Sequence, residues 1–354
     1  MHKILIVNLN WVGDVLFTIP ALKAVKKARE DIFLAVALPG RCRRILEFNP
    51  AVDEIIEFDE RNQHRSLIAR ARFISEIKKK KFAKVIFFHR SSTRVIIFSL
   101  CKIPEREGYC RSKTRLFLTK CVPDPGKDSM HKAQYFLNLV NALGYPLKEM
   151  SYEFYVSEEE IKIALQLLRE FEVNVEDKII CLHPGANWKP KMWPLNYYIQ
   201  LINAISAEVE KVNFLIVGTR KETELARTII ENVHHREKVF DLTGRTTLGT
   251  LGGIFLFTDV MISGDSGPLH LCSALQLPDK GRYKRPLAIG LYGPTSKDLT
   301  GPLSGNFLIL EGERKNDCSL PCYNFNCQDY HCMYSLKPQI VLKTVRRYLN
   351  ECET

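Results

Sequence analysis

The feature that most constrains this chain is a regular alternation of short apolar strand patterns with helical patterns. Runs such as KILIV and IFLAVAL are rich in β-branched residues and apolar throughout, as strands buried on both faces of a parallel sheet are. The predicted strands cover residues 3–7, 32–38, 84–89, 178–183, 213–218, 259–264 and 286–293. The predicted helices cover residues 21–28, 65–81, 131–143, 196–206, 222–233 and 338–350. This alternation predicts an α/β fold with parallel sheets.

Length and a change of charge indicate two domains. A chain of 354 residues is about twice the usual size of one domain. The charge balance turns at residues 151–160, where an acidic helix start follows. We therefore place a first domain at residues 1–155 and a second at 156–336, and we expect the last helix, within 337–354, to pack back on the first domain. Two doubly wound domains facing each other would leave a cleft at the carboxyl ends of both sheets, where ligands bind in such folds.

Composition and apolar runs indicate the cellular context. Apolar residues make up 45% of the chain and charged residues 26%, an ordinary composition for a soluble globular protein. No apolar run approaches the roughly 18 residues of a membrane span, and the N-terminus enters a strand without a signal-peptide pattern. These features predict a cytoplasmic protein. The 11 cysteines are then expected to be reduced thiols rather than a disulfide framework.

Positive charge is concentrated in the first half of the chain. Residues 1–150 hold 28 Lys and Arg against 15 Asp and Glu, whereas the remainder holds 23 against 25. Either a solvated basic surface or an anionic partner (nucleic acid, membrane headgroups or a phosphorylated substrate) explains the asymmetry. The basic residues are dispersed, without an aromatic platform or zinc-finger spacing, which makes nucleic acid the weaker choice. They include Arg41, Arg43, Arg44, Lys78 to Lys81, Arg111, Lys113 and Arg115.

The loop after the first predicted strand is unusual for a nucleotide-binding fold. It carries a single glycine, Gly13, followed by a carboxylate, Asp14. A phosphate at this position would be bound by backbone N–H groups rather than met by a negative charge. Asp14 therefore either caps the short helix before Pro20 or has chemistry of its own.

Residues 263–275, SGDSGPLHLCSAL, follow a predicted strand and open a helix. Asp265 and Ser266 can cap this helix, and Gly267 allows a close backbone approach. The N–H groups around Gly267, Leu269 and His270, aided by the helix dipole, suit a diphosphate. A capped helix with nothing bound is the alternative, and the neighbouring loops favour binding.

Three further loops follow predicted strands. In residues 182–194, Lys191 is either placed to meet phosphate oxygens as a point charge or simply solvated. His183, in the same loop, fits a hydrogen-bonded structural histidine better than a catalyst. Glu222, at a helix start, could accept hydrogen bonds from a ribose or only favour the helix dipole. Residues 291–298 form a turn that could line the cleft.

Several cofactor motifs are absent from the sequence. It has no G-x-G-x-x-G for a nicotinamide or flavin, no Walker lysine motif and no G-x-S-x-G elbow. It has no Asp-x-Asp pair, which removes the usual way of holding a divalent ion on a nucleotide-sugar diphosphate. An enzyme without a metal would neutralise a leaving diphosphate with lysines and helix N-termini, and the second half offers both.

The loop sequences, taken in order, resemble those of a known family. NLNWVGDVLFTIPAL, HPGANWKPKMWP, VGTRKETELA, SGDSGPLHLCSAL and LYGPTSKD are similar to segments of the lipopolysaccharide heptosyltransferases and their ADP-heptose-using relatives. The resemblance covers most of the chain. It implies a GT-B fold of two Rossmann-like domains facing across a cleft, with the lipid-linked acceptor on the N-terminal domain and the nucleotide sugar on the C-terminal domain.

The resemblance also implies roles for individual residues. Asp14 and Lys191 are the predicted catalytic residues: Asp14 would be the general base for the acceptor hydroxyl, and Lys191 matches the lysine that meets the diphosphate. Glu222 matches a nucleotide-contacting acid. The donor loop corresponds to Asp265, Ser266, Gly267, Pro268, Leu269 and His270, and the acceptor side to Trp11, Gly13 and Arg41.

We therefore predict an inverting, metal-independent glycosyltransferase that moves heptose from ADP-heptose to an inner-core lipopolysaccharide acceptor, as a peripheral protein at the inner face of the cytoplasmic membrane. Its partners would be the nucleotide sugar, the lipid-linked saccharide and an anionic membrane surface, with no nucleic acid, cofactor or divalent metal. Another nucleotide sugar or acceptor is the alternative within this class. A catalytically silent nucleotide-sugar-binding module is the alternative outside it.

A run of four cysteines near the C-terminus follows the pattern C-x3-C-x4-C-x4-C. It consists of Cys318, Cys322, Cys327 and Cys332. Four thiolates could hold zinc or an iron–sulfur cluster. The spacing fits no standard zinc ribbon, so reduced cysteines are the favoured interpretation.

Overall fold

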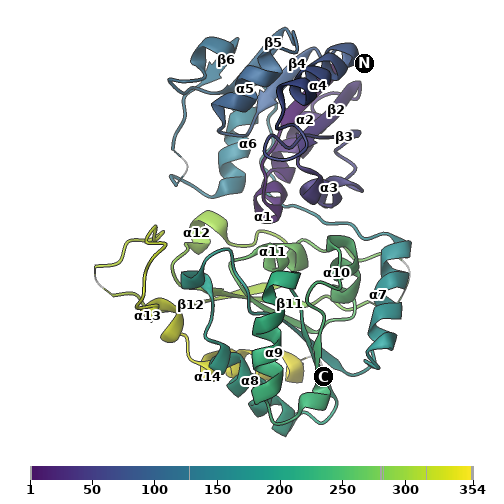
Figure 1. Cartoon of the computed structure of the whole chain (residues 1–354), viewed down its shortest axis with the longest axis vertical. Helices are drawn as coiled ribbons and strands as arrows, with labels where there is room; N and C mark the ends of the chain where they lie inside the picture. The colour runs from purple at the N-terminus through teal and green to yellow at the C-terminus, as the bar shows by residue number, and fades with distance from the viewer. Residues whose placement is uncertain (1, 127, 280, 282, 316, 352–354) are drawn as a thin grey trace. The chain divides into compact units, whose positions relative to one another are not determined.

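A computed structural model describes residues 2–126, 128–279, 281, 283–315 and 317–351 of the chain. It divides into two compact units, Met1–Phe154 and Tyr155–Thr354. The division falls beside the boundary at residue 155 placed from the sequence. Each unit consists of one sheet with helices packed on it (Figure 1), and each is described by itself below.

Unit 1 is built on a six-stranded parallel sheet with the strand order β3-β2-β1-β4-β5-β6. The strands are β1 (His2–Val7), β2 (Ile32–Leu38), β3 (Glu54–Glu57), β4 (Lys84–Phe87), β5 (Glu105–Tyr109) and β6 (Lys120–Val122). β1 pairs with both β2 and β4, so the first strand of the chain lies at the middle of the sheet. Its last four residues are fully buried, as the unbroken apolar pattern predicts.

The helices of unit 1 are α1 (Val12–Leu16), α2 (Ile19–Lys27), α3 (Gly40–Leu46), α4 (Leu67–Lys80), α5 (Ser92–Ser99) and α6 (Lys132–Ala142), with a 3₁₀ turn η1 at Arg115–Phe117. Ser66 caps α4, because its hydroxyl accepts a hydrogen bond from the Ala69 N–H at 3.1 Å. Phe73 of α4 and Phe98 of α5 belong to one core cluster, against which Phe117 of η1 packs. These three elements therefore cover the same face of the sheet.

Unit 2 repeats this architecture with the strand order β12-β11-β10-β7-β8-β9, again parallel throughout. The strands are β7 (Lys178–His183), β8 (Val212–Ile216), β9 (Val239–Asp241), β10 (Val260–Gly264), β11 (Leu287–Tyr292) and β12 (Phe307–Glu311). The helices are α7 (Glu158–Glu170), α8 (Leu195–Glu208), α9 (Thr223–Asn232), α10 (Leu248–Phe255), α11 (Gly267–Ser273), α12 (Lys297–Thr300), α13 (His331–Tyr334) and α14 (Pro338–Glu351). Three 3₁₀ turns cover Lys189–Lys191 (η2), Arg220–Glu222 (η3) and Arg236–Lys238 (η4).

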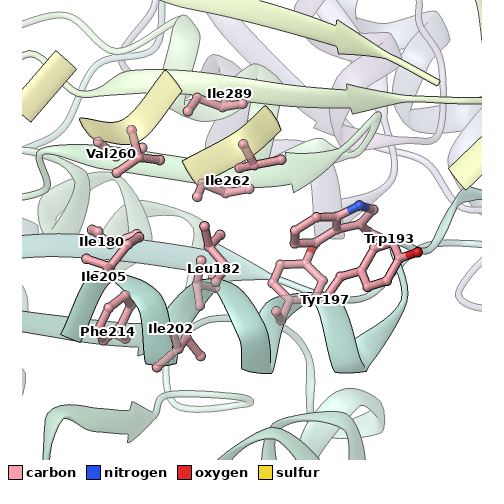
Figure 2. Packing of buried hydrophobic residues seen from close by; sticks show 14 of the residues in the cluster. Ile180, Leu182, Trp193, Tyr197, Ile202, Ile205, Phe214, Val260, Ile262 and Ile289 are labelled. Atoms are coloured by element: carbon pink, nitrogen blue, oxygen red, sulfur yellow. The ribbon is translucent and has the colours of Figure 1, made fainter. Parts of the chain in front are cut away.

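The C-terminal helix α14 differs from the sequence-based expectation, which packed it on the first domain. Its buried residues Val341, Val345 and Leu349 belong to the core cluster of unit 2, together with Ile205 of α8. Figure 2 shows part of this cluster, in which Trp193 and Tyr197 border the strand residues. The apolar stripe of α14 faces α8 because α8 presents a matching apolar face beside it. Residues 352–354 of the predicted terminal segment lie outside the described residues.

Each strand and helix predicted from the sequence is present within one or two residues of its predicted bounds. The strands that the sequence did not reveal are mostly outer ones: β3, β6, β9 and β12 lie at the sheet edges. They are short or partly exposed, so no long apolar run marks them. β5 was missed because it reads EREGY, although Glu107 within it is buried and pairs with Lys84 at 3.0 Å.

One pair of cysteines contradicts the expectation of reduced thiols. Cys110, directly after β5, and Cys121, in β6, form a disulfide with their Cα atoms 5.0 Å apart. Pairing of the two strands brings these residues together, which the spacing alone could not reveal. The other eight described cysteines are free. Within the described residues, no helix has the length and apolarity needed to span a membrane.

The packing of α14 on α8 predicts a stability effect. Val345→Ala removes two buried methyl groups and should lower the free energy of unfolding by about 2 kcal/mol. Lys343→Ala, at an exposed position of the same helix, is the control and should change it by less than about 0.5 kcal/mol. Urea unfolding followed by tryptophan fluorescence measures both. Equal effects of the two variants would contradict this packing.

Candidate functional site

Each sheet reverses its strand order at one place, and the predicted site residues gather there. In unit 1 the chain runs outward from β1 to β3 and then returns to place β4 on the other side of β1. In unit 2 the same reversal separates β7 from β10. Loops after adjacent strands diverge at such a reversal, and ligands of open α/β sheets bind there. The loops after β1, β4, β7 and β10 are therefore the ones to examine.

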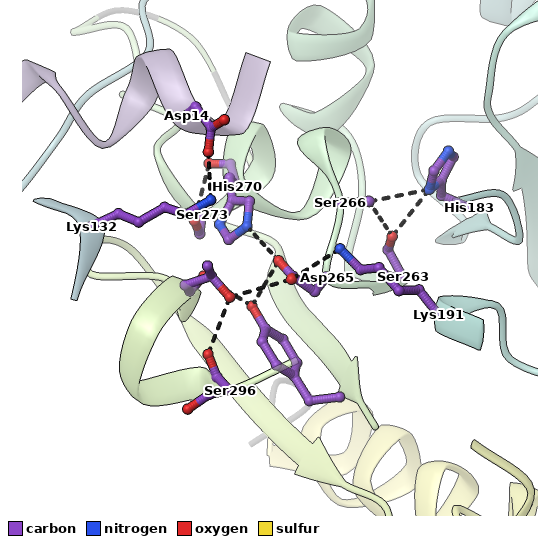
Figure 3. Close-up of polar contacts among 12 residues, drawn as sticks. Asp14, Lys132, His183, Lys191, Ser263, Asp265, Ser266, His270, Ser273 and Ser296 are labelled. Atoms are coloured by element: carbon purple, nitrogen blue, oxygen red, sulfur yellow. Dashed lines mark hydrogen bonds and ion pairs between the residues drawn. The ribbon is translucent and has the colours of Figure 1, made fainter. Parts of the chain in front are cut away.

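In unit 2, several side chains converge on Asp265, the residue directly after β10 (Figure 3). The Lys191 Nζ atom, from the loop after β7, lies 3.0 Å from Asp265 Oδ2, and His270 Nε2 lies 3.1 Å from Oδ1. Thr300 donates a hydrogen bond to Oδ2 at 3.2 Å, and Tyr292 donates one to Oδ1 at 3.4 Å. The carboxylate thus accepts from four side chains, which is about its full capacity.

Asp265 is ionised by this arrangement. It is 8% exposed, and burial alone would disfavour the charge. The positive charge of Lys191 and the hydrogen bond from His270 outweigh burial and hold the pKa of Asp265 well below its usual range. Lys191 has three ammonium protons, so it retains donors for a ligand while Asp265 fixes its position. The arrangement supports Lys191 as a point charge for an anion, with Asp265 as its anchor.

His183 connects three loops of unit 2. Its Nε2 lies 3.3 Å from Glu222 Oε1, in the loop after β8, and its Nδ1 lies 3.1 Å from Ser263 Oγ and 3.2 Å from Ser266 Oγ. Tyr198 also donates to the His183 backbone carbonyl at 3.2 Å. His183 is buried, and these contacts agree with the expectation of a hydrogen-bonded structural histidine.

Glu222 is held by the same network. Its second oxygen accepts from the Thr219 backbone N–H and, at 2.8 Å, from the Thr219 hydroxyl. Although burial opposes it, the His183 and Thr219 contacts lower the pKa of Glu222 to about 2. Gly185 and Gly218 leave the necessary room, because a Cβ atom at Gly185 would lie 1.5 Å from Glu222 Oε1. Glu222 is therefore a carboxylate held in one position at the carboxyl ends of the strands.

The start of α11 differs in detail from the predicted diphosphate cradle. Ser266 is the N-cap residue, but its side chain makes no capping bond and instead bonds Ser263 Oγ at 2.7 Å. Asp265 does not cap the helix either, because its carboxylate binds Lys191 and His270. The His270 backbone N–H donates to Ser266 O at 3.4 Å, and Pro268 has no N–H. The N–H groups of Gly267 and Leu269 remain in the first turn, where a helix supplies no acceptor.

In unit 1, Asp14 lies within α1 rather than at its N-cap, which is Trp11. The interpretation of Asp14 as a helix cap is therefore wrong. Its carboxylate accepts a hydrogen bond from Lys132 Nζ at 2.7 Å, at the start of α6 (Figure 3). The Asp14 side chain is 25% exposed, so a substrate can reach it. The sequence analysis missed this partner of Asp14, because 118 positions separate Lys132 from it.

The loop before Asp14 is fixed by buried polar contacts. Asn8 donates to the Thr18 hydroxyl at 2.9 Å. Asn10 accepts from the Arg94 guanidinium at 2.8 Å through its Oδ1, and its Nδ2 lies 3.1 Å from His89 Nε2. Burial and the charges of Arg94, Arg111 and Arg61 lower the pKa of His89 to about 3. His89 is therefore neutral at physiological pH, and the loop is rigidly connected to the end of β4.

Two further arginines line the carboxyl edge of the same sheet. Arg90 and Arg111 both donate to the Tyr135 hydroxyl at 3.0 Å, and both pair with Asp124. With His89 they line a small cavity beyond β4 and β5. Two guanidinium groups share one carboxylate here, so this edge keeps a net positive charge suited to an anionic group.

The predicted acceptor residues are adjacent to one another. Trp11 is 56% exposed, and the Arg41 guanidinium lies 5.6 Å from its ring centroid. Arg41 also donates to the Asn10 carbonyl at 3.1 Å. Gly13 is the second residue of α1, half-buried beside Asp14. Trp11, Gly13, Asp14 and Arg41 thus form one surface around the loop after β1.

The four C-terminal cysteines Cys318, Cys322, Cys327 and Cys332 are free thiols. Among the described residues there is no group of three or more His, Cys, Asp or Glu side chains arranged to hold a metal ion. The loop that carries these cysteines is held by a backbone hydrogen bond, in which the Cys322 N–H donates to the Pro294 carbonyl at 2.8 Å.

Comparison with known proteins decides the family. Residues 70–327 match the sequence profile of glycosyltransferase family 9 (heptosyltransferase). The chain belongs to this family. It is therefore a glycosyltransferase, and the resemblance and the enzyme class predicted from its loops are confirmed.

Relatives and solved structures agree over the full length of this glycosyltransferase. Lipopolysaccharide heptosyltransferase 2 of Salmonella typhimurium is 25% identical and covers 99% of both chains. A glycosyl transferase family 9 protein from Veillonella parvula superimposes with a TM-score of 0.86 at 21% identity, covering 99% of this chain and 98% of that one. The ADP-heptose LPS heptosyltransferase II of E. coli superimposes with a TM-score of 0.77 at 22% identity, covering 99% and 100%. The GT-B fold class with two Rossmann-like units is thereby confirmed.

The half-buried Glu222 predicts a pH-dependent stability. Because its folded-state pKa lies below the ordinary value of 4.5, its charge stabilises the fold above about pH 4.5, and this contribution is lost as the pH falls toward 2. Between about pH 6 and about pH 3 we expect the native chain to lose about 2 kcal/mol more unfolding free energy than Glu222→Gln. Urea unfolding at several pH values measures this. Glu224→Gln, at an exposed neighbour, should keep the native pH slope. A native slope in Glu222→Gln would contradict the assignment.

Proposed function

We propose that this glycosyltransferase transfers heptose from ADP-heptose to the inner core of lipopolysaccharide, with inversion at the anomeric carbon and without a divalent metal. The names of its relatives support the sugar, the nucleotide and the acceptor class. The absence of an Asp-x-Asp pair and the position of Lys191 support neutralisation of the diphosphate by the protein itself.

The proposed step couples one proton transfer to one substitution. The acceptor hydroxyl gives its proton to the Asp14 carboxylate while its oxygen bonds to the anomeric carbon of the heptose. The bond from that carbon to the diphosphate breaks, and its electron pair leaves with ADP. Lys191 and the first-turn N–H groups of α11 stabilise the negative charge that develops on the diphosphate. Attack from the face opposite the leaving group gives inversion.

One observation carries the proposal: each reversal point holds one half of the required chemistry, already oriented by an ion pair. In unit 1, Lys132 holds the Asp14 carboxylate at 2.7 Å. In unit 2, Asp265 holds the Lys191 ammonium at 3.0 Å. A base for an acceptor and a cation for a leaving anion are what a glycosyl transfer from a nucleotide sugar needs. A catalytically silent binding module would have no use for the first pair.

The proposed cellular setting follows from the acceptor. A lipid-linked saccharide is presented at a membrane surface, so we propose that the protein is cytoplasmic and peripheral at the inner face of the cytoplasmic membrane. The excess of basic residues in residues 1–150 supports an anionic surface as partner. These basic residues are dispersed along the sequence, which argues against nucleic acid as the partner.

Asp14→Asn tests the general base. It keeps the size of the side chain but removes the base, and loss of a general base lowers kcat by about 10²- to 10⁴-fold. ADP affinity and melting temperature should stay the same. Lys132→Met should lower kcat by about tenfold, and Lys132→Arg should recover most of it, because a cation is what orients Asp14. Steady-state kinetics with ADP-heptose measures all three.

Asp31→Asn is the matched control. Asp31 is exposed and directly precedes β2, so it lies at the amino end of the strands, opposite to the carboxyl end that carries Asp14. This variant should behave like the native chain. Near-normal turnover of Asp14→Asn would rule out this residue as the base.

Lys191→Ala tests the diphosphate site. It should weaken ADP binding by about 10- to 100-fold, because a charge-assisted contact contributes about 1.5–3 kcal/mol. Isothermal titration with ADP, AMP and UDP measures affinity and base preference, and the loss should be smaller for AMP. Lys189→Ala, at an exposed neighbouring lysine, is the control. Transfer should persist in EDTA, and activity that disappears with EDTA and returns with magnesium would refute the metal-free step.

A further inference from the structure

Three large aliphatic side chains of unit 1 are mostly exposed. Leu67 is 80% exposed, Ile68 is 68% exposed and Leu116 is 92% exposed. Leu67 and Ile68 are the first two residues of α4, and Leu116 is the middle residue of η1. Isolated exposed leucines are common on protein surfaces, so their grouping and surroundings decide their meaning.

These side chains lie at one edge of one face of unit 1. α4 follows β3 and η1 follows β5, so the start of α4 and η1 both lie at the carboxyl edge of the parallel sheet. α4 contacts α5, and α5 contacts η1. Ile96 of α5, between them, is 38% exposed. We call the surface formed by residues 61–72 and 111–117 the carboxyl rim.

The carboxyl rim is strongly basic and its outer cations are unpaired. Arg61, Arg65, Arg72, Lys113 and Arg115 are exposed, and among the described residues none of their side chains forms an ion pair with an acid. The rim itself contains no Asp or Glu. Exposed aliphatic side chains therefore lie beside unneutralised cations both at the start of α4 and at η1, on the two sides of α5.

Arg41, Arg43 and Arg44, which the sequence analysis also singled out, behave differently. Arg41 pairs with Asp59 at 3.4 Å, and Arg43 pairs with Glu47 and Glu57 at 3.5 and 3.6 Å. The Arg44 guanidinium lies over the rings of Phe48 and Phe154. The charge of this trio is thus largely satisfied inside unit 1, whereas that of the carboxyl rim is available to a partner.

We infer that the carboxyl rim docks on an anionic lipid surface. Exposed leucine and isoleucine side chains insert at the boundary between headgroups and acyl chains, while arginines and lysines around them meet the lipid phosphates. A nucleic acid would use the cations but would leave the aliphatic tips in water. A second copy of the chain would place one set of unpaired cations against another, which disfavours self-association.

Docking through this rim serves the proposed transfer. The rim and Asp14 belong to the same carboxyl edge of the unit 1 sheet. A saccharide attached to a lipid lies at the headgroups. Docking of the rim would therefore bring the edge that carries Asp14 close to that saccharide. This consequence rests on the proposed function, whereas the docking itself does not.

Co-sedimentation of the full chain with vesicles tests the inference. The probes are vesicles of phosphatidylcholine alone and of phosphatidylcholine with about one third phosphatidylglycerol. The native chain should bind the anionic vesicles and be released by moderate salt, because screening shortens the attraction to about 8 Å. Two triple variants remove either the cations (Arg65, Arg72 and Arg115 to Gln) or the apolar tips (Leu67, Ile68 and Leu116 to Ser). Each should weaken binding to anionic vesicles by about 10- to 100-fold.

A matched triple variant controls for net charge. Lys78, Lys79 and Lys102 are exposed at the opposite edge of the same face, and their change to Gln removes the same three charges. This variant should bind vesicles like the native chain. With a water-soluble acceptor sugar without acyl chains, the rim variants should keep native kcat. With the acceptor embedded in vesicles, their apparent KM should rise by about tenfold or more.

Several outcomes would overturn the inference. One is equal loss of vesicle binding in the rim and control variants, which would mean a diffuse charge effect. Others are no vesicle binding by the native chain, tighter binding to a mixed-sequence oligonucleotide than to vesicles, and loss of a dimer in the rim variants. Native vesicle binding without transfer to any acceptor would instead refute the proposed function and leave the docking intact, so the two failures are distinguishable.

Discussion

The parallel pairing of strands around β1 in unit 1 and β7 in unit 2 is the constraint on which the rest of the structure depends. In each unit the chain adds strands on one side, then returns to add the next strand on the other side of the first. Loops that follow the two central strands then leave the sheet in opposite directions and leave room between them. Asp14 with Asn10 and His89, and Lys191 with Asp265, gather at these two points. The strand order, rather than attraction between the polar side chains, therefore brings these side chains together.

Ion pairs and hydrogen bonds then fix the orientation of these side chains. Asp265 accepts from Lys191, His270, Tyr292 and Thr300, so its carboxylate is satisfied within the protein. The Lys191 ammonium has three protons and therefore retains donors beyond this pair. Glu222 is fixed in the same way by His183. Such networks are costly to leave half-satisfied, so each member is held in one geometry. Preorganised charges need little rearrangement when a ligand brings its own charge.

The counts of charged residues in the two halves do not show which basic residues are paired with acids. Arg41 and Arg43 are paired with Asp59, Glu47 and Glu57, whereas Arg65 and Arg115 form no ion pair among the described residues. A count of residues cannot separate the two cases, since both contribute equally to net charge. Only the positions of Asp59, Glu47 and Glu57 around the first group reveal which cations face solvent. Which cations remain available to a partner is therefore decided by the tertiary structure.

The sequence by itself determined the fold class, the strands and helices with strong patterns, and the loops that carry Asp14, Lys191, Glu222 and Asp265. These follow from local periodicity and from the rule that parallel strands end at one edge. Only the tertiary structure decided that Lys132 contacts Asp14, that α14 packs on α8, and that Cys110 meets Cys121. Lys132 and Asp14 are 118 positions apart, and Arg346 of α14 and Glu208 of α8 are 138 apart. Local patterns carry no information about such pairs. Edge strands such as β6 were hidden for the related reason that pairing, rather than their own apolarity, makes them strands.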